Sequence, residues 1–430
     1  MRFFKTLMAA LMAAGLVVAV IVAGTLGGWW RMPLAPAGDI AAFAAAATAR
    51  IKAESKGNAA FILMKAGKPV AEVFVSKGAP VDRDTHFQVA SLSKWSTALG
   101  VMTLVEQGKL DLDTPVSRYL TRWKLPSSAF DNDKVTIRRL LSHTAGLTDG
   151  LGYGGFKPGE PVQSLEASLT KATDASPGAE GATKVGKEPG SFDYSGGGYT
   201  LLQLVIEEVS GQPFNTYMTE AVFKPLGMTR STFLLPETPT NLAEFYDVDS
   251  SRAIHYRFTA LGAASLYTSA ADMARLIAAH TPGPNGEPVG RGVLKPETLE
   301  VMRKPEARQY GTDIWGLGVI LYAPINKGDF VVGHDGSNAP AINTTARVNP
   351  TTGDGIVILE SGNKRLASAI AGEWVFWSTG YVDTVVVLME FRSTLMQVAI
   401  GGGIAFLVVF LLVWRLTRRR KIKPHPPSPE

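Results

Sequence analysis

The sequence predicts an α+β fold, an α/β sandwich in which an antiparallel sheet of about five strands is flanked by helices. Strand patterns near the start of the chain and again after about residue 315 indicate that the sheet is built from both ends of the domain. Helical patterns between them predict an inserted, mostly helical region. A long uncharged run near each end of the chain predicts one transmembrane helix at each terminus.

The first uncharged run covers residues 6–30. It reaches the length of about 20 residues that a spanning helix needs, whereas the apolar core of a signal peptide has about 7–15. Trp29 and Trp30 at its end are typical of an interfacial aromatic belt. Residues 1–31 are therefore interpreted as an N-terminal membrane anchor or uncleaved signal. A signal removed near residues 35–37 is the alternative, with a proline that makes the cleavage site poor.

The second uncharged run is interpreted as a transmembrane helix over residues 393–414, followed by a basic cytoplasmic tail over 415–430. The Lys and Arg residues of that tail, less Glu430, account for the whole formal charge of +5. The charge therefore does not indicate nucleic-acid binding, which needs a basic stripe with interleaved aromatic residues. Positive flanks stay inside, so both termini are expected in the cytoplasm, with residues 31–392 on the extracytoplasmic (periplasmic) side of the inner cell membrane.

The elements of the domain are expected in a simple order. Residues 37–56 are alanine-rich and helical, and residues 61–64 and 70–75 predict a hairpin around a Gly-Lys-Pro turn. Apolar residues at helical spacing then predict a buried helix that begins near Ser91 and stops at Gly108. Further helices are expected from residue 113, over 136–143 and 199–210, and after Ser269. Strands are expected over 318–322, 330–333, 342–348 and 355–359, before a closing helix over 366–378.

Between two of these helices, residues 149–190 are rich in Gly, Pro and Ser, with few periodic apolar positions. A loop of this length in a compact domain usually forms a functional rim or lid. The chain contains no cysteine, which excludes disulfides, zinc–thiolate sites and cysteine nucleophiles. No His-Glu-x-x-His spacing or other ligand cluster indicates a metal.

Ser91 and Lys94 are the first candidate catalytic residues. They lie three positions apart at the start of the buried helix, so their side chains share one face. A nearby amine can take the serine proton, and this activates an otherwise poor nucleophile. Ser168 and Ser361 also have a lysine three positions later. Only Ser91 follows a strand-like approach and has candidate partners downstream.

Two later segments supply those partners. Tyr194 lies in a glycine-rich turn before a helix, and it could carry a proton if a neighbouring ammonium such as Lys94 lowered its pKa from near 10. The segment 333–337 ends a predicted strand, where glycines would let a substrate backbone approach. His334 within it could equally be a core or rim histidine. His143, at the end of a short helix, is interpreted as structural.

Together the motifs Ser91–Lys94, Tyr194–Gly196 and His334–Gly336 resemble the three active-site motifs of the serine beta-lactamase/penicillin-binding family, class C type. That group includes D-alanyl-D-alanine carboxypeptidases, D-aminopeptidases and beta-lactamase-like esterases. The stretches 140–147 and 198–202 are also typical of these proteins. The order and spacing of the motifs agree with the expected strands and helices.

The resemblance implies a serine hydrolase domain over residues 38–380. It implies that Ser91 is the acylated nucleophile and that Lys94 and Tyr194 share the acid–base work. The backbone N–H groups of Ser91 and Ser337 would form the oxyanion hole. The residues that it implies for substrate binding are His334, Asp335, Gly336 and Gly196.

One departure from the family pattern concerns the second motif, which usually ends in asparagine and here ends in Gly196. Loss of that side-chain amide puts peptide and beta-lactam turnover in doubt and affects ester hydrolysis or transacylation less. The sequence therefore predicts a membrane-anchored serine hydrolase acting on ester, D-amino-acid peptide or amide, or beta-lactam-like substrates. The alternative is a catalytically inactive envelope protein with a binding or scaffolding role.

The expected partners are a small-molecule or peptidoglycan-type substrate and membrane lipid. No metal or cofactor is implied, no nucleic acid is expected, and no protein partner is indicated. A channel or transporter is a weaker reading, because the two uncharged runs carry no intramembrane ionisable residue. There is no Gly-x-Ser-x-Gly elbow, which argues against an α/β-hydrolase.

Overall fold

The computed structural model describes residues 2–235 and 239–419, so residues 420–430 of the expected basic tail lie outside the described part of the chain. The chain forms two compact units. One is a domain of residues 33–379, and the other is a helical unit made from both ends of the chain.

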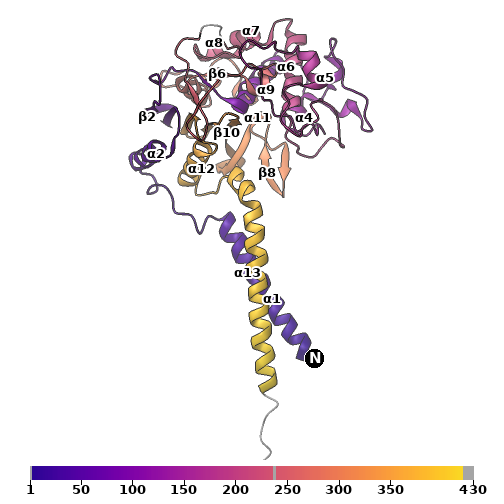
Figure 1. The fold of residues 1–430 in the computed structure, drawn as a ribbon, viewed down its shortest axis with the longest axis vertical. Coiled ribbons are helices and arrows are strands. Elements are labelled where there is room, and N and C mark those ends of the chain that lie inside the picture. The colour runs from indigo at the N-terminus through magenta and orange to yellow at the C-terminus, as the bar shows by residue number, and fades with distance from the viewer. Residues whose placement is uncertain (1, 236–238, 420–430) are drawn as a thin grey trace, which may run out of the picture. The chain divides into compact units, whose positions relative to one another are not determined.

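An eight-stranded antiparallel sheet runs through the domain (Figure 1). Its strands, in spatial order, are β2 (Lys68–Val75), β1 (Ala59–Lys65), β12 (Gly355–Ser361), β11 (Ile342–Val348), β10 (Asp329–Asn338), β9 (Ile320–Ile325), β8 (Thr312–Trp315) and β7 (Ala307–Gln309). Strands β1 and β12 come from opposite ends of the domain and pair with each other. The α+β class and the origin of the sheet are therefore confirmed, and the short β7 and β8 widen the sheet beyond the expected five or so strands.

Helices cover both faces of this sheet. On one face lie α2 (Ile40–Glu54) and α12 (Leu366–Thr379), and on the other lie α3 (Ser93–Glu106) and α10 (Ala270–Ala278). Each uses a buried apolar stripe, since Phe43 on α2 and Trp374 on α12 are almost fully enclosed. The start of α10 matches the sequence, because the Ser269 side chain accepts the Asp272 N–H at 3.1 Å.

The inserted region between β2 and β7 contains most of the domain's helices, and in Figure 1 α4, α5 and α6 gather on the side away from α2. Its further helices are α4 (Ile137–Leu141), α5 (Leu165–Lys171), α6 (Gly196–Ser210), α7 (Phe214–Met218), α8 (Lys224–Leu226), α9 (Leu261–Ala264) and α11 (Pro296–Met302). Short strands β3 (Phe87–Gln88) and β6 (Tyr267–Thr268) pair, as do β4 (Phe245–Tyr246) and β5 (Arg252–Ala253). Single turns complete it: η1 (Ala90–Leu92), η2 (Val116–Arg118), η3 (Asn132–Lys134) and η4 (Thr219–Phe223), with η5 (Asn326–Gly328) later in the sheet.

The structure differs from the sequence prediction in two segments, one predicted as a helix and one predicted as a loop. From residue 113 the chain forms only the single turn η2, because Pro115 is extended and the Val116 N–H bonds instead to the Val135 carbonyl at 2.8 Å. The expected loop over 149–190 contains α5, whose N-cap Ser164 accepts the Ala167 N–H.

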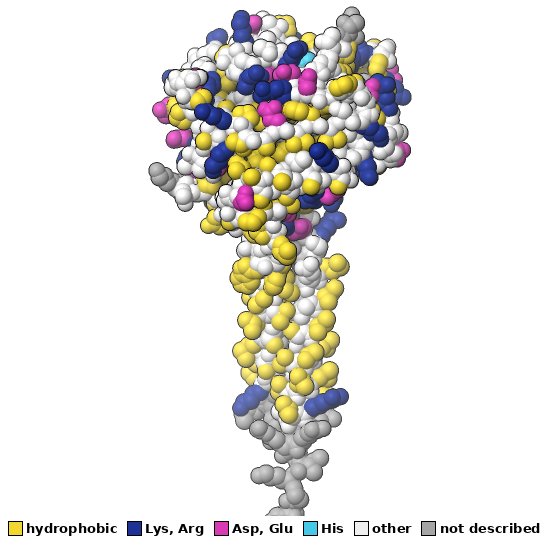
Figure 2. All heavy atoms as spheres, turned by 90° about the vertical axis from the view of Figure 1, so that its left-hand side faces the viewer, with side chains coloured by type: hydrophobic (Ala, Val, Ile, Leu, Met, Phe, Trp, Pro, Cys, Tyr) yellow, Lys and Arg dark blue, Asp and Glu magenta, His cyan; other side chains and the backbone are white. Residues whose placement is uncertain are grey.

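The helical unit pairs α1 (Arg2–Leu26) with α13 (Thr384–Arg419). Both are long and apolar enough to cross a membrane, and hydrophobic side chains cover the face shown in Figure 2. The pair is antiparallel, because Phe3 contacts Phe410 near one end while Arg31 bonds to Glu390 at 2.7 Å near the other. Gly401 permits this close packing, since a Cβ there would lie 2.9 Å from the Ile21 side chain.

Candidate active site

The nucleophile segment is held at the start of α3 by the sheet. Ala90 has a φ of +49°, a left-handed conformation that costs a non-glycine residue about 1–3 kcal/mol and places Ser91 at a sharp turn. The Thr344 hydroxyl of β11 donates to the Val89 carbonyl at 2.8 Å. Gly336 of β10 lets that strand approach, because a Cβ there would lie 2.0 Å from the same carbonyl oxygen. The sequence predicted that Gly336 contacts the substrate. In the structure its close neighbour is the backbone of Val89, in the segment that leads to Ser91.

The Lys94 amine reaches the Ser91 hydroxyl. Its Nζ lies 3.1 Å from Ser91 Oγ and donates a second hydrogen bond of 2.6 Å to the Ala263 carbonyl of α9. The lysine is 2% exposed. Burial lowers its pKa to about 7, although the Asp149 carboxylate acts in the opposite direction. A substantial fraction of Lys94 is therefore neutral near pH 7 and has a lone pair for the serine proton.

Tyr194 completes the group around the nucleophile. Its hydroxyl is hydrogen-bonded to Ser91, and Lys94 Nζ lies 5.1 Å from the centre of its ring. The residue is 36% exposed, yet the protein around its hydroxyl still desolvates that group and raises its pKa. The lowering of the Tyr194 pKa that the sequence predicted is thus reversed, because burial of the phenol is the largest influence on that pKa. Tyr194 is a neutral phenol that can donate a proton, and Lys94 is the better base.

His143 packs directly behind Tyr194. The two ring centres are 4.3 Å apart, and the Trp315 ring meets the imidazole edge-on at 4.7 Å. His143 Nδ1 accepts the Ser195 backbone N–H at 3.1 Å, so the imidazole is tied to the residue after Tyr194. Burial lowers the pKa of His143 well below its usual value, so it stays neutral. The structural role of His143 stays a prediction, and the sequence did not indicate its contact with the Tyr194 ring.

The side chains of the third motif, His334 and Asp335, lie on opposite faces of the sheet. His334 is buried against Trp315, and its Nδ1–H donates to the Asp335 carbonyl at 2.6 Å. Burial and the nearby Lys94 lower the pKa of His334 to about 3, so it carries no charge for a substrate carboxylate. The Asp335 carboxylate bonds to Arg347 at 2.9 Å and accepts the Tyr322 hydroxyl at 2.8 Å. Neither side chain lines the catalytic cavity.

A cavity of about 360 Å³ opens beside the nucleophile. Ser91, Lys94, Tyr194 and Ser337 all line it, so the structure brings together the candidate nucleophile, both acid–base candidates and the second candidate oxyanion residue. The remaining lining residues were missed from the sequence: Ala90, Gly150, Leu151, Gly152, Tyr153, Ser176, Ala264 and Asn338. Several of these residues belong to the segment 149–190, and its prediction as a rim or lid was the sequence signal that could have found them.

Gly196 does not line the cavity, and the fold explains its lack of a side chain. A Cβ at this position would lie 2.0 Å from the Leu151 carbonyl oxygen and 3.0 Å from the Tyr153 ring. The backbone of residues 150–153 therefore occupies the space that an asparagine side chain would need. Leu151 and Tyr153 therefore lie where the family's side-chain amide would be.

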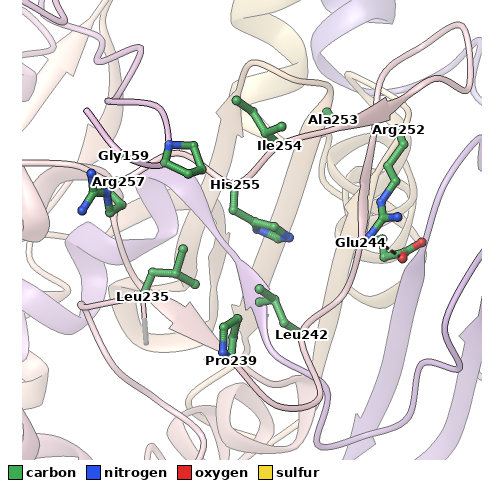
Figure 3. A pocket seen from close by; sticks show the side chains of 11 residues that line it. Gly159, Leu235, Pro239, Leu242, Glu244, Arg252, Ala253, Ile254, His255 and Arg257 are labelled. Carbon is green, nitrogen blue, oxygen red and sulfur yellow. Dashed lines mark ion pairs between the residues drawn. The ribbon is translucent and has the colours of Figure 1, made fainter. Parts of the chain in front are cut away.

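A second, larger cavity of about 630 Å³ contains none of the motif residues. Leu242, Ile254 and His255 are among the residues that line it, and Glu244 and Arg252, which form an ion pair of 2.7 Å, lie at one end (Figure 3). We assign the chemistry to the smaller cavity, because nucleophile and base meet there. Among the described residues, no cluster of His, Asp or Glu is arranged to hold a metal ion.

Comparison with known proteins places these features in context. The family model described as Beta-lactamase matches residues 43–375. A Bacillus subtilis (strain 168) protein named as penicillin-binding protein PbpX is 30% identical over 195 residues, which is 44% of this chain and 44% of that protein. The matched region thus spans less than half the length of this curated relative.

Solved structures show the same fold. The octameric penicillin-binding protein homologue from Pyrococcus abyssi superposes with a TM-score of 0.62 at 24% identity, covering 82% of this chain and 78% of its own. EstCE1, described as a hydrolase with promiscuous acyltransferase activity, superposes with a TM-score of 0.61 at 21% identity, covering 77% and 97%.

Proposed function

Since this chain belongs to the beta-lactamase family of serine hydrolases, we propose that it is a membrane-anchored hydrolase that acts through an acyl-enzyme on Ser91. The observation that carries the proposal is the 3.1 Å contact between Ser91 Oγ and the buried Lys94 amine at the wall of an open cavity. A protein that kept the fold only for scaffolding would have no need to bury a lysine against a serine, because burial of an amine is costly.

The chemistry follows from the protonation states. Neutral Lys94 takes the Ser91 proton as Oγ attacks the substrate carbonyl carbon, and the N–H groups of Ser91 and Ser337 stabilise the oxyanion. The leaving alkoxide departs with a proton from Tyr194, which regains one from the Lys94 ammonium. Water then attacks the acyl-enzyme by the same proton transfers, so that the carboxylic acid leaves and Ser91 is restored.

Among possible substrates, we favour carboxylic esters over amides and beta-lactams. Gly196 supplies no side-chain amide to hold a substrate amide, and the backbone of Leu151 occupies that space. An ester needs no such donor, and its alkoxide is a better leaving group than an amine. EstCE1 is described as a hydrolase with promiscuous acyltransferase activity, which agrees with acyl transfer from an ester. The relatives named for penicillin binding keep D-amino-acid peptides and amides as the second substrate class in this proposal.

The expected location is the inner cell membrane, with the catalytic domain on the extracytoplasmic side. Helices α1 and α13 have the length and apolar character of membrane spans. Because they pair in antiparallel fashion, the start of α1 and the end of α13 lie at the same end of the pair. The Lys and Arg residues after position 414 favour the cytoplasm for that end. Membrane lipid is then the partner of the apolar helical surface.

The test is covalent labelling by a fluorophosphonate probe, followed by turnover of p-nitrophenyl esters, D-amino-acid amides and nitrocefin. We expect labelling of the wild type, loss of labelling in Ser91→Ala, and turnover of esters ahead of the other substrates. Ser168→Ala is the matched control, because Ser168 also precedes a lysine by three positions but is buried in α5. Absence of any Ser91-dependent label with all probes would favour the scaffolding alternative.

A further inference from the structure

Asp149 lies at the beginning of the segment that replaces the missing amide. Its carboxylate is 5% exposed and accepts three hydrogen bonds. The Leu151 N–H donates to it at 3.1 Å, the Ser195 hydroxyl donates at 2.6 Å, and the Gly197 N–H is the third donor. Burial raises the pKa of Asp149, and these three converging donors act in the opposite direction by favouring the ionised carboxylate. One side chain thus joins the cavity wall to the first turn of α6.

The first turn of α6 is shaped to receive this segment. A Cβ at Gly197 would lie 2.4 Å from Asp149 Oδ2, and a Cβ at Gly196 would lie 2.0 Å from the Leu151 oxygen. The Ser195 hydroxyl that donates to Asp149 also accepts the Gly198 N–H at 2.8 Å, so it caps the helix. The glycines therefore provide the space in which Asp149 and Leu151 lie.

The segment after Asp149 is then secured along its length. The Tyr153 hydroxyl bonds to Thr200 of α6 at 2.7 Å, and Asn338 of β10 donates to the Tyr153 carbonyl at 3.2 Å. The Ser176 N–H donates to the Gly152 carbonyl at 2.9 Å. Residues 150–153 all line the catalytic cavity. They form a fixed wall, and Asp149 is its attachment nearest to Tyr194.

We propose that Asp149 is the positioning residue that sets substrate selectivity, by holding the backbone of residues 150–153 as the wall of the acyl-binding cavity. This inference rests on the proposed esterase function. It identifies the preferred substrates as esters whose acyl chains are short enough to lie between Ser91 and this wall, both of which line the cavity. Larger acyl chains would need the wall to move outward.

The Asp149 carboxylate also acts on Lys94, because its charge raises the pKa of the lysine. The other titratable groups acting around this lysine are Tyr194, Tyr199, His143 and His334, all uncharged near neutral pH because burial opposes their ionised forms. Around Asp149 itself, Asp193 and Tyr153 are the further titratable groups. An anion favours the ammonium form of Lys94, so removal of the anion lowers the lysine pKa further. A purely structural residue would lack this second effect.

The experiment compares full-length wild type with Asp149→Asn and Asp174→Asn. Asp174 is a matched control: it is also a buried carboxyl, and its Oδ2 accepts the Gly155 N–H at 3.2 Å just beyond the wall. For Asp149→Asn we expect kcat/KM for an octanoate ester relative to an acetate ester to rise roughly tenfold. The acid limb of its pH profile should move to lower pH. Asp174→Asn should show neither change.

Hydrogen exchange of the peptide covering residues 149–155 gives a readout that does not depend on turnover. Faster exchange in Asp149→Asn, with a thermal midpoint close to that of Asp174→Asn, would support the wall attachment. Unchanged exchange and an unchanged octanoate-to-acetate ratio in an active Asp149→Asn enzyme would overturn the inference. If the wild type hydrolyses no ester and Ser91 takes no label, the proposed function itself is wrong. If Asp149→Asn changes hydrogen exchange in such a protein, Asp149 has only a structural role, and its role in substrate selectivity is overturned.

Discussion

At the scale of single residues, the site depends on the burial of one amine. A fall in the Lys94 pKa from 10.5 to about 7 corresponds to roughly 5 kcal/mol of lost stabilisation of its charged form. Burial is the larger influence, and the Asp149 carboxylate offsets only part of it. Burial in the same surroundings keeps Tyr194 and His334 uncharged. The environment of each side chain therefore decides which one can accept a proton and which can donate one.

The first prediction concerns pH. Above a pKa of about 7 the Lys94 amine is neutral and can accept the Ser91 proton, whereas below it the ammonium cannot. Ester hydrolysis, measured as kcat/KM from pH 5 to 9, should therefore rise through about pH 7 and then level. Lys94→Met should lose roughly 10²- to 10⁴-fold in rate together with this limb. A limb that persisted in Lys94→Met would assign the titration to another group.

A second residue-scale prediction concerns Gly196→Asn, which restores the amide usual in the family. Because its Cβ would lie 2.0 Å from the Leu151 oxygen, we expect overpacking that costs about 1–3 kcal/mol and no gain of nitrocefin hydrolysis. Thermal unfolding and nitrocefin turnover measure this. Gly211→Asn at the other end of α6 is the control, since it has open space and a left-handed φ that asparagine tolerates. Efficient beta-lactamase activity in Gly196→Asn would show that the wall yields.

At the scale of elements, strand β10 explains how the third motif is divided. The strand continues to Asn338, beyond its expected end at residue 333, so successive side chains alternate between the faces. His334 and Gly336 face Lys94 and Val89 on the side of α3, and Asp335 faces α12. There Arg347 is fully enclosed, its guanidinium lying 3.8 Å from the centre of the Tyr322 ring. Although burial alone would raise the pKa of Asp335, Arg347 and neighbouring hydroxyls lower it.

This buried pair predicts a large effect on stability. Arg347→Met should lower the free energy of unfolding by about 3–5 kcal/mol, because it leaves the Asp335 charge buried and unpaired. Urea unfolding measures the loss, and the double variant with Asp335→Asn should recover part of it. Arg308→Met serves as the control, since the pair of Arg308 with Asp313 is mostly exposed and should contribute less than about 1 kcal/mol. Equal losses in the two single variants would refute the argument.

At the scale of the whole molecule, the chain combines a domain of the beta-lactamase family with a pair of long apolar helices from its two ends. Substrate is then expected outside the cytoplasm, where small esters or D-amino-acid derivatives of the envelope would meet the cavity. The protein has no cysteine, which suits it to an oxidising compartment without requiring one. That lack also makes the topology simple to test.

The fourth prediction uses single cysteines introduced into this cysteine-free chain. In intact cells a membrane-impermeant maleimide should label Lys68→Cys, an exposed position at the start of β2. It should label Ser428→Cys only after the membrane is permeabilised, and both variants should sediment with membranes after carbonate washing. Labelling of both positions in intact cells would contradict the proposed orientation, and release by carbonate would contradict the anchor.

The α+β class, both apolar helices and the closeness of Ser91 to Lys94 could be predicted from the sequence, because these follow from local periodicity and from residues three positions apart. It could not determine the state of Lys94 and Tyr194, since desolvation arises from segments distant in the chain. Nor could it show that residues 150–153 occupy the place of the absent amide at Gly196, or that His143 supports Tyr194. Those relations depend on packing between elements, which only the tertiary structure decides.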